Sequence, residues 1–247
     1  IHDIGFVHDH KGWKRWLMKK VWITWPLHCV DQLITVSEAT KKAVLREEPW
    51  FSPGRIAVIP TVVPQHFHPR LVEPQNSKPV ALHIGLADNK NLRRHAAAVQ
   101  GLNIHLRIIG EPSEADELLL KQLNIEYSAQ SKLTDEEMQH AYTTSDFLLF
   151  ASTLEGFGMP IIEAQMVGLP VITSNIDPMR EVAGAGALLC NPLETESIRQ
   201  AVAELIQNES LQKQLIEAGR ENHKRYSPAL VAVELVALYS NILDSES

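Results

Sequence analysis

The 247-residue sequence has few cysteines, no long uncharged apolar run and no excess of basic residues. Its two cysteines, Cys29 and Cys190, lie far apart without a CxxC motif, which argues against a disulfide framework or a zinc knuckle and favours a reducing cytoplasm. No stretch approaches eighteen uncharged apolar residues, and no secretion leader is recognisable, so the sequence predicts neither a spanning helix nor secretion. The formal net charge of −7 gives the protein as a whole no electrostatic attraction to nucleic acid.

Hydrophobic residues make up 45% and charged residues 21%, the balance of a globular protein with a packed core. Apolar runs of strand length alternate with helical patterns, which predicts a doubly wound, Rossmann-like α/β domain with a parallel sheet from about Val80 to Asn191. The predicted strands are 32–36, 80–85, 104–110, 147–151, 170–173 and 187–190. The predicted helices are 37–46, 90–100, 113–123, 134–143, 160–167 and 195–207. The apolar run Ile1 to Val7 reads as a buried strand, so we expect residues upstream of it.

Two interruptions suggest the domain limits. Five prolines between Pro60 and Pro79 indicate an extended linker, and residues 226–228 (Tyr-Ser-Pro) separate two helical patterns, the last of which runs over about 229–243. We therefore predict the tail of one Rossmann-like domain with a linker over 1–70, a second domain over 71–226, and a C-terminal helix over 227–247. We expect that helix to pack back toward the N-terminal part.

The most informative segment is Glu155-Gly156-Phe157-Gly158-Met159-Pro160-Ile161-Ile162-Glu163, directly after the predicted strand 147–151. Its five fixed identities, at positions 155, 156, 158, 160 and 163, would coincide by chance at roughly one in a million starting points. A strand, a glycine-bearing loop and a helix N-terminus together present free backbone N–H groups and a dipole that bind anions. The segment therefore predicts a ligand site at the end of this strand.

The two carboxylates of this segment favour hydroxyl groups over phosphate, because a carboxylate and a phosphate repel each other. Glu155 lies in the loop, where it could accept hydrogen bonds from a sugar, and Glu163 lies about one turn into the helix, where it could hold a ribose diol. The structural alternative is that Glu155 caps the helix and Glu163 is a solvated helix residue.

This segment resembles the retaining glycosyltransferases of family four, whose architecture of two Rossmann-like domains is called GT-B. Further stretches follow the family's order: His2-Asp3, Ile34-Thr35-Val36-Ser37-Glu38, Ile56 to Pro60, Gly85 with Lys90-Asn91-Leu92, and Gly168-Leu169-Pro170-Val171-Ile172. The resemblance implies that the chain covers the last part of an acceptor domain and a whole nucleotide-sugar domain. We accordingly expect most of the acceptor domain to be absent.

The resemblance also implies the reaction and its catalytic residues. A sugar would pass from a nucleoside-diphosphate sugar to an acceptor with retention of configuration, and no metal or other cofactor is expected. Glu155 would contact the transferred sugar, and His2 would lie near the reacting carbon. Lys90, on the loop that begins at Gly85, would neutralise the departing diphosphate.

The remaining implied contacts hold the nucleotide sugar. Glu163 would bind the ribose, and the backbone N–H groups of Phe157, Gly158 and Met159 would meet the sugar hydroxyls or the diphosphate. Backbone groups of the loop Ser131-Lys132-Leu133 would face the base, which leaves uridine and guanosine donors open.

One departure from the family pattern concerns the diphosphate. Family members usually carry an arginine shortly before the lysine, whereas Leu86-Ala87-Asp88-Asn89 stands in this position here. Arg93 and Arg94 follow one turn into a helix, where we expect solvated surface residues. The cationic clamp on the diphosphate is therefore predicted to be incomplete.

The segment Lys11 to Trp25 combines five basic residues with four tryptophans. On a helical wheel Trp13, Trp16 and Leu17 share one face with Val21, which is typical of a helix lying on an anionic bilayer. The alternative is a surface helix whose tryptophans pack inward. Both interpretations stay open from the sequence.

Two other functions also remain open: a catalytically silent nucleotide-sugar binding module, and a sugar-nucleotide epimerase on the same architecture. The Glu155 to Glu163 spacing favours a transferase. We expect a glycan or lipid-linked acceptor and no nucleic-acid partner, as in polysaccharide or glycolipid biosynthesis in the cytoplasm, with peripheral membrane contact through Lys11 to Trp25.

Overall fold

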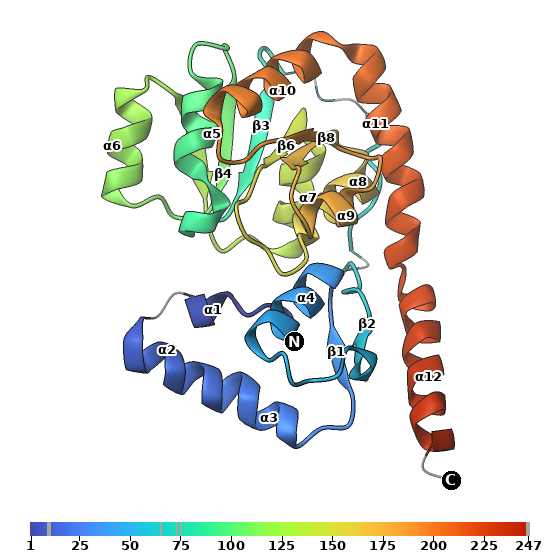
Figure 1. Cartoon of the computed structure of the whole chain (residues 1–247). Helices are drawn as coiled ribbons and strands as arrows, with labels where there is room; N and C mark the ends of the chain where they lie inside the picture. Colours follow the sequence, from blue (N-terminus) through green and yellow to red (C-terminus); the bar gives the residue numbers. More distant parts are fainter. Residues whose placement is uncertain (9–10, 65, 73, 75, 246–247) are drawn as a thin grey trace. The chain divides into compact units, whose positions relative to one another are not determined.

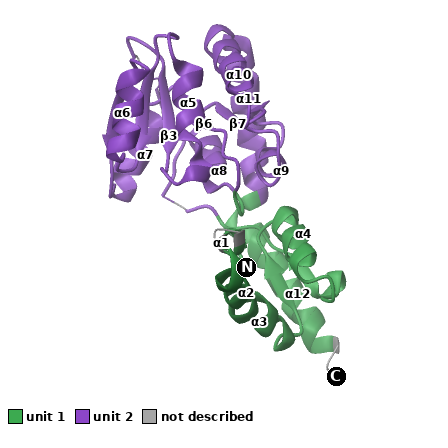
Figure 2. Ribbon diagram, turned by 60° about the vertical axis from the view of Figure 1, so that its left-hand side comes forward, with its two compact units in different colours: residues 1–62, 155–157, 226–247 green, residues 63–154, 158–225 purple. Residues whose placement is uncertain are grey.

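The computed structural model describes residues 1–8, 11–64, 66–72, 74 and 76–245, and it divides into two compact units. Unit 1 comprises residues 1–62, 155–157 and 226–247, and unit 2 comprises residues 63–154 and 158–225 (Figure 2). The predicted domain limits of 1–70, 71–226 and 227–247 remain a proposal.

Unit 2 is built on a six-stranded parallel sheet with the strand order β5-β4-β3-β6-β7-β8 (Figure 1). The strands are β3 (Val80–Ile84), β4 (His105–Ile109), β5 (Glu126–Gln130), β6 (Phe147–Phe150), β7 (Val171–Ser174) and β8 (Leu188–Cys190). The chain builds the sheet outward from β3 in one direction and then returns to β6 to build it in the other. This reversal confirms the predicted doubly wound fold.

Helices cover both faces of this sheet. They are α5 (Leu92–Val99), α6 (Glu114–Gln122), α7 (Asp135–Thr143), α8 (Met159–Val167), α9 (Met179–Ala183), α10 (Thr195–Gln207) and α11 (Glu209–Asn222), with 3-10 turns η3 (Asp88–Lys90) and η4 (His223–Tyr226). Helix α5 packs with α6 and α10, whereas α8 packs with α7, α9 and α11. All residues of β6 and β7 are buried between the two layers, so the central strands form the core.

Unit 1 contains the two-stranded parallel sheet of β1 (Leu33–Thr35) and β2 (Ile56–Val58). Its helices are α1 (Gly5–His8), α2 (Gly12–Lys19), a π-helical turn η1 (Lys20–Thr24), α3 (Trp25–His28), α4 (Glu38–Glu47), the 3-10 turn η2 (Pro53–Arg55) and α12 (Pro228–Ser245). A helical stretch, Glu209–Asp244, contains a window of mean hydropathy 1.4 and is long and apolar enough to cross a membrane by length and composition alone. Only uncharged runs were considered in the sequence, and Glu234 interrupts this one, so the stretch was not singled out there.

The predicted strand over residues 1–7 is also wrong. Helix α1 occupies Gly5–His8, and the residues before it form no strand. Ile4 and Val7 are both buried in a small core with Val44 and Ile56. Their spacing of three residues suits one side of a helical turn, which buries them as well as a strand would.

Candidate functional site

The predicted donor residues follow the two strands at which the sheet reverses its order. Gly85 and Lys90 follow β3, and the segment leading into α8 follows β6. Ligands of doubly wound sheets bind at the carboxyl ends of the strands on either side of such a reversal. The fold therefore brings Lys90 and the start of α8 to the same edge of the sheet.

Lys90 lies across the end of β3 toward β6. Gly85 has φ +86°, and a Cβ atom there would lie 3.1 Å from Cγ and 3.2 Å from Cε of Lys90. The Lys90 Nζ lies 4.8 Å from the ring centroid of Phe150, the last residue of β6, within range of a cation–π interaction. Gly85 thus leaves the space that the lysine side chain occupies.

Two asparagines, to which the sequence analysis assigned no role, fix the loop that carries Lys90. Asn89 Nδ2 donates to the Leu154 carbonyl at 2.7 Å, and Asn91 Nδ2 donates to the carbonyls of Ala151 at 2.9 Å and Pro192 at 2.7 Å. Asn91 is buried and has φ +66°. The loop after β3 is therefore tied to the loops after β6 and β8, although it lacks the arginine of the family pattern.

Arg93 and Arg94 have different environments. Arg93 is exposed, as predicted. Arg94 donates to Asn91 Oδ1 at 3.0 Å and to the Leu193 carbonyl at 3.2 Å, so the prediction of a solvated residue is wrong for this position. Arg94 supports Asn91.

Helix α8 begins at Met159 with Gly158 as its N-cap residue. Gly158 has φ +106°, a conformation that a residue with a side chain rarely adopts, and Pro160 occupies the first turn as expected. This terminus follows β6. Pro160 has no N–H and the Ile161 N–H donates to the Gly158 carbonyl at 3.0 Å, so the helix dipole and the amides that precede Pro160 are what it offers to a ligand. Its sequence and conformation suit an anion.

Glu163 is held by Tyr142 of α7. The Tyr142 hydroxyl donates to Glu163 Oε2 at 2.5 Å, and the Phe67 ring packs edge-on against Tyr142 at 5.2 Å. Burial raises the pKa of Glu163, while the Tyr142 hydrogen bond and the nearby His66 oppose that rise. Burial, and the adjacent Glu163 carboxylate, also raise the pKa of Tyr142. Glu163 is therefore a positioned carboxylate rather than a solvated helix residue.

Unit 1 contains the other predicted contacts, His2 and the residues Glu155 to Phe157. Thr40 and Ser37, at the start of α4, hold their backbones: the Gly156 carbonyl accepts from Ser37 Oγ at 2.8 Å, and Thr40 Oγ1 lies 3.1 Å from the His2 carbonyl and 3.2 Å from that of Gly156. A Cβ on Gly156 would lie 2.2 Å from the His2 carbonyl oxygen. The fold thus brings His2 and Gly156 together, and only glycine fits at position 156.

Phe157 is buried, and its ring packs edge-on against Tyr226 at 5.4 Å. The side chain of Phe157 therefore has a structural role, which leaves its backbone as the part available to a ligand.

The predicted base-contacting loop connects β5 to α7. Ser131 and Lys132 are exposed, Leu133 is half-buried, and Lys132 has φ +56°. Thr134 and Glu137 form the expected capping box at the start of α7.

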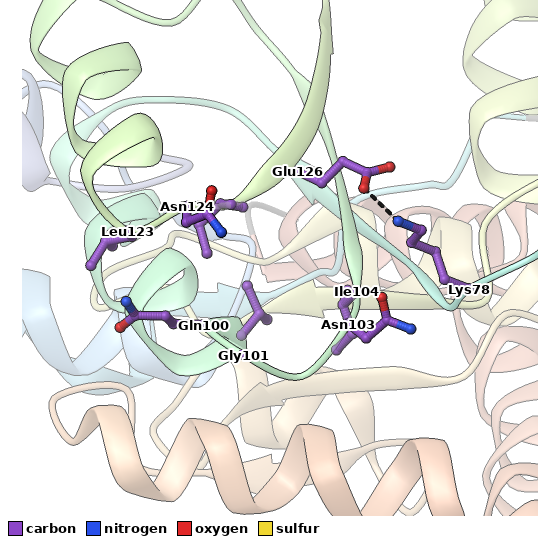
Figure 3. Close-up of a pocket in the computed structure, with 10 residues that line it drawn as sticks. Lys78, Gln100, Gly101, Asn103, Ile104, Leu123, Asn124 and Glu126 are labelled. Atoms are coloured by element: carbon purple, nitrogen blue, oxygen red, sulfur yellow. Dashed lines mark hydrogen bonds and ion pairs between the residues drawn. The ribbon is translucent and has the colours of Figure 1, made fainter.

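A cavity of about 520 Å³ in unit 2 lies at a different place, beside the starts of β4 and β5 (Figure 3). Glu126 and Lys78 form an ion pair at its edge, and Asn103 and Asn124 are among its lining residues. The amino ends of the strands border this cavity, so it is distinct from the predicted donor site. Among the side chains that the structure describes, no group of three His, Cys, Asp or Glu residues could hold a metal ion.

The fold and the residues at its strand reversal agree with the comparisons to known proteins. A family model described as glycosyl transferases group 1 matches residues 68–222, and the chain belongs to this family. The match includes Gly85, Lys90, Gly158 and Glu163.

Curated relatives include several mannosyltransferases. The MMP alpha-(1->4)-mannosyltransferase of Mycolicibacterium hassiacum is 26% identical over 87% of this chain and 55% of its own length. The O-antigen chain mannosyltransferase B of Escherichia coli is 30% identical over 38% of this chain and 24% of its own length. The phosphatidyl-myo-inositol mannosyltransferase of Mycobacterium leprae is 25% identical over 66% and 38%. The chain thus spans about half or less of these relatives.

Solved structures show the same fold. Sucrose-phosphate synthase from Thermosynechococcus elongatus gives a TM-score of 0.82 at 21% identity, covering 99% of this chain and 67% of that protein. An Anabaena protein solved with UDP and glucose gives 0.79 at 16% identity, covering 98% and 70%. The predicted Rossmann-like fold of the GT-B glycosyltransferases is confirmed.

Proposed function

We propose that this chain carries the donor site of a retaining, metal-independent glycosyltransferase of family four that uses a nucleoside-diphosphate sugar. The observation that carries the proposal is the strand reversal itself, where Lys90 follows β3 and the glycine-capped helix α8 with Glu163 follows β6. A cation, a helix N-terminus and a positioned carboxylate match the diphosphate and the ribose of such a donor.

In this proposal the diphosphate leaves with electrostatic help from the protein. The bond between the anomeric carbon and the phosphate oxygen breaks, the acceptor oxygen bonds to the same face, and its proton passes to the departing phosphate oxygen. Lys90 and the N-terminus of α8 stabilise the charge that develops. They would supply without a metal the positive potential that a metal supplies elsewhere.

The sugar and the acceptor are assigned by class. Glu155, His2 and the backbone of Phe157 to Met159 would contact the sugar, the backbone near Leu133 would contact the base, and Glu163 would hold the ribose. Relatives named mannosyltransferases support a hexosyl donor. We propose a glycan or lipid-linked acceptor, with the reaction in the cytoplasm and at a membrane surface.

A silent nucleotide-sugar binding module is the second candidate, because the usual arginine is replaced and Asn89 at the end of that stretch is engaged with a backbone carbonyl. Binding of the donor does not distinguish the two functions, whereas transfer of the sugar occurs only in the transferase.

The first test is thermal unfolding of the chain with saturating UDP, GDP, ADP and their sugar conjugates. A ligand at a hundred times its Kd stabilises by about 2.7 kcal/mol, so we expect one nucleotide family to raise the Tm. Glu163→Gln and Lys90→Ala should lose this shift, and the exposed-surface variant Lys121→Ala should keep it. A Tm that no nucleotide changes would contradict the donor site.

The second test is release of nucleoside diphosphate from the identified donor, with and without a glycan acceptor. Release that Lys90→Ala abolishes supports the transferase. Binding without release in the complete protein supports the silent module.

A further inference from the structure

Four of the five tryptophans project from one helix of unit 1. Helices α2 and α3 and the π turn between them form a helical stretch from Gly12 to His28. Ile23 and Leu27 on this stretch are 1% exposed and belong to the core of unit 1. In contrast, Trp13, Trp16, Trp22 and Trp25 are 69%, 62%, 63% and 68% exposed. Within unit 1 the greater part of each of these four side chains is therefore exposed.

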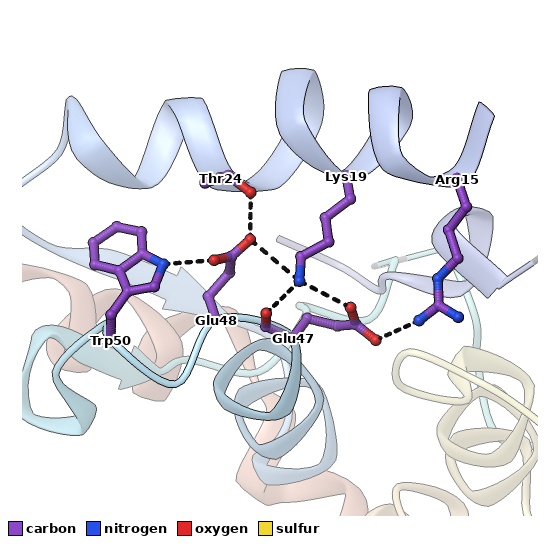
Figure 4. A network of polar contacts seen from close by, with 6 residues as sticks. All are labelled: Arg15, Lys19, Thr24, Glu47, Glu48 and Trp50. Atoms are coloured by element: carbon purple, nitrogen blue, oxygen red, sulfur yellow. Dashed lines mark hydrogen bonds and ion pairs between the residues drawn. The ribbon is translucent and has the colours of Figure 1, made fainter. Parts of the chain in front are cut away.

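Ion pairs fix the inner side of the helix (Figure 4). Arg15 lies 2.9 Å from a Glu47 carboxylate oxygen, and Lys19 lies 3.2 Å from Glu47 and 3.7 Å from Glu48. Thr24 also donates to Glu48. Two of the basic residues are thus used in packing against the end of α4, and they leave the opposite side to the tryptophans.

The outer side is an apolar row with a spacing of four residues: Trp13, Leu17, Val21 and Trp25, all exposed. In a regular α-helix, residues four apart drift around the axis by about 40° at each step. The wider π turn over Lys20–Thr24 reduces that drift and keeps Trp25 near the others. We call this row, together with Trp16, the tryptophan face; Trp22 instead lines a cavity of about 350 Å³ with His2 and Ile23.

Positive charge accompanies this face. Arg15 and Lys19 form ion pairs with Glu47, whereas the three other basic residues, Lys11, Lys14 and Lys20, are exposed. No acidic residue occurs between Lys11 and Trp25. Exposed apolar area with unbalanced lysines on one helix matches an anionic, partly apolar surface.

We propose that the tryptophan face binds the surface of a bilayer that contains anionic lipid. Indole rings partition to the boundary between headgroups and acyl chains, where their N–H groups remain hydrated, and lysines beside them interact with lipid phosphates. This inference does not depend on the donor site.

Helix α12 also exposes apolar residues but lacks basic ones. Its Val233 and Val236 are 65% and 64% exposed, so it also carries an outward apolar side. No lysine or arginine follows Arg225 in the sequence, so α12 offers no charge complementarity to anionic lipid. The lysines beside the tryptophan face are therefore the reason for proposing an anionic bilayer rather than any other apolar surface.

The experiment is co-sedimentation of the 247-residue chain with vesicles of phosphatidylcholine alone or mixed with phosphatidylglycerol. Because four of the five tryptophans lie on the tested helix, their emission should shift to the blue and be quenched by brominated acyl chains. Each basic residue near an anionic surface contributes about fivefold to binding, so Lys14→Gln with Lys20→Gln should weaken it by about 25-fold. Lys121→Gln with Lys213→Gln, exposed on unit 2, is the charge-matched control.

The apolar part is tested by Trp13→Ser with Trp25→Ser, which should weaken binding by about tenfold or more. Leu118→Ser, at an exposed position of α6 in unit 2, should leave it unchanged. All of these positions are exposed, so circular dichroism of the variants should match that of the parent. Absence of binding, equal binding to neutral vesicles, or equal loss in test and control variants would overturn the proposal. So would light scattering that shows self-association of the chain removed by the tryptophan substitutions, since the occupant would then be a second copy.

Discussion

Replacing Tyr142 by phenylalanine isolates the group that positions Glu163. The change removes one hydroxyl from a buried ring and leaves the packing against Phe67 in place. The carboxylate then loses the 2.5 Å hydrogen bond that opposes the effect of burial on its pKa. We therefore expect the pKa of Glu163 to rise further in the variant.

The size of the effect depends on pH. A hydrogen bond to a charged group contributes about 1.5–3 kcal/mol, and a bond between neutral groups about 1 kcal/mol. Because the folded pKa of Glu163 lies above its unfolded value, its contribution is fully present below the unfolded pKa and is lost as pH rises through the folded pKa. Tyr142→Phe should therefore cost about 1 kcal/mol in acid, where the carboxyl is protonated, and about 2 kcal/mol or more in mild alkali.

The assay is urea unfolding followed by far-UV circular dichroism across this pH range. All five tryptophans lie between residues 13 and 50 in unit 1, so tryptophan emission recorded in parallel follows the unit that the substitution does not touch. Tyr127→Phe on β5 is the matched control, because it removes a tyrosine hydroxyl that lies away from Glu163.

A second measurement is nucleotide affinity in the same buffers. We expect Glu163 to accept hydrogen bonds from the ribose only while it is a carboxylate. As the pH is lowered, the nucleotide affinity of Tyr142→Phe should therefore begin to fall at a higher pH than that of the parent. An equal stability loss in acid and alkali, or a loss no greater than that of Tyr127→Phe, would refute the assigned role of this hydrogen bond.

Three further substitutions or modifications test other parts of the structure. Gly156→Ala places a methyl group 2.2 Å from a backbone oxygen, so it should destabilise unit 1 by about 1–3 kcal/mol in the unfolding transition followed by tryptophan emission. Gly54→Ala is the control and should change stability little, because the nearest atom to its methyl group would be 3.8 Å away. Burial raises the pKa of the Cys190 thiol to about 12, so iodoacetamide at pH 8 should add one group, on exposed Cys29, to the native chain and two in urea, as counted by mass spectrometry. Burial lowers the pKa of His83 to about 4, and it also lowers the pKa of His95, whose Nδ1 lies 2.9 Å from that of His83. Stability present above pH 6.5 should therefore be lost as pH falls, with His83 contributing about 2 kcal/mol at pH 5. In urea unfolding His83→Leu should reduce this loss, and the part due to His95 should remain.

The sequence predicted the buried part of unit 2 well, because strands covered on both faces appear as short continuous apolar runs. The interior strands β3, β6 and β7 were found within a residue of their observed limits. The edge strand β5 was not among the strands predicted from apolar runs. Its residues Glu126 to Gln130 are mostly exposed, and it exists through its pairing with β4 rather than through apolar residues of its own.

The donor-site residues remain a prediction, and the sequence singles them out where one segment carries the chemistry. Glu163 and Gly158 belong to one nine-residue segment, and Lys90 to a short one. The hydroxyl groups that support this segment were not predicted. Tyr142 lies 21 residues before Glu163, and Ser37, named only as part of a stretch in the family's order, lies 119 residues before Gly156. Only the folded chain shows what these hydroxyl groups bind.

The π turn over Lys20–Thr24 sets which side chains beyond it share a side with Trp13. A π turn holds about one residue more than a turn of regular α-helix, so deleting one residue from it would restore the α-helix and leave Trp25 in the row and Leu27 in the core. Deleting one residue from the regular helix α2 would instead rotate Trp25 and Leu27 by about 100° relative to Trp13. Two chains of almost equal composition, charge and mean hydropathy would then carry one apolar edge or two.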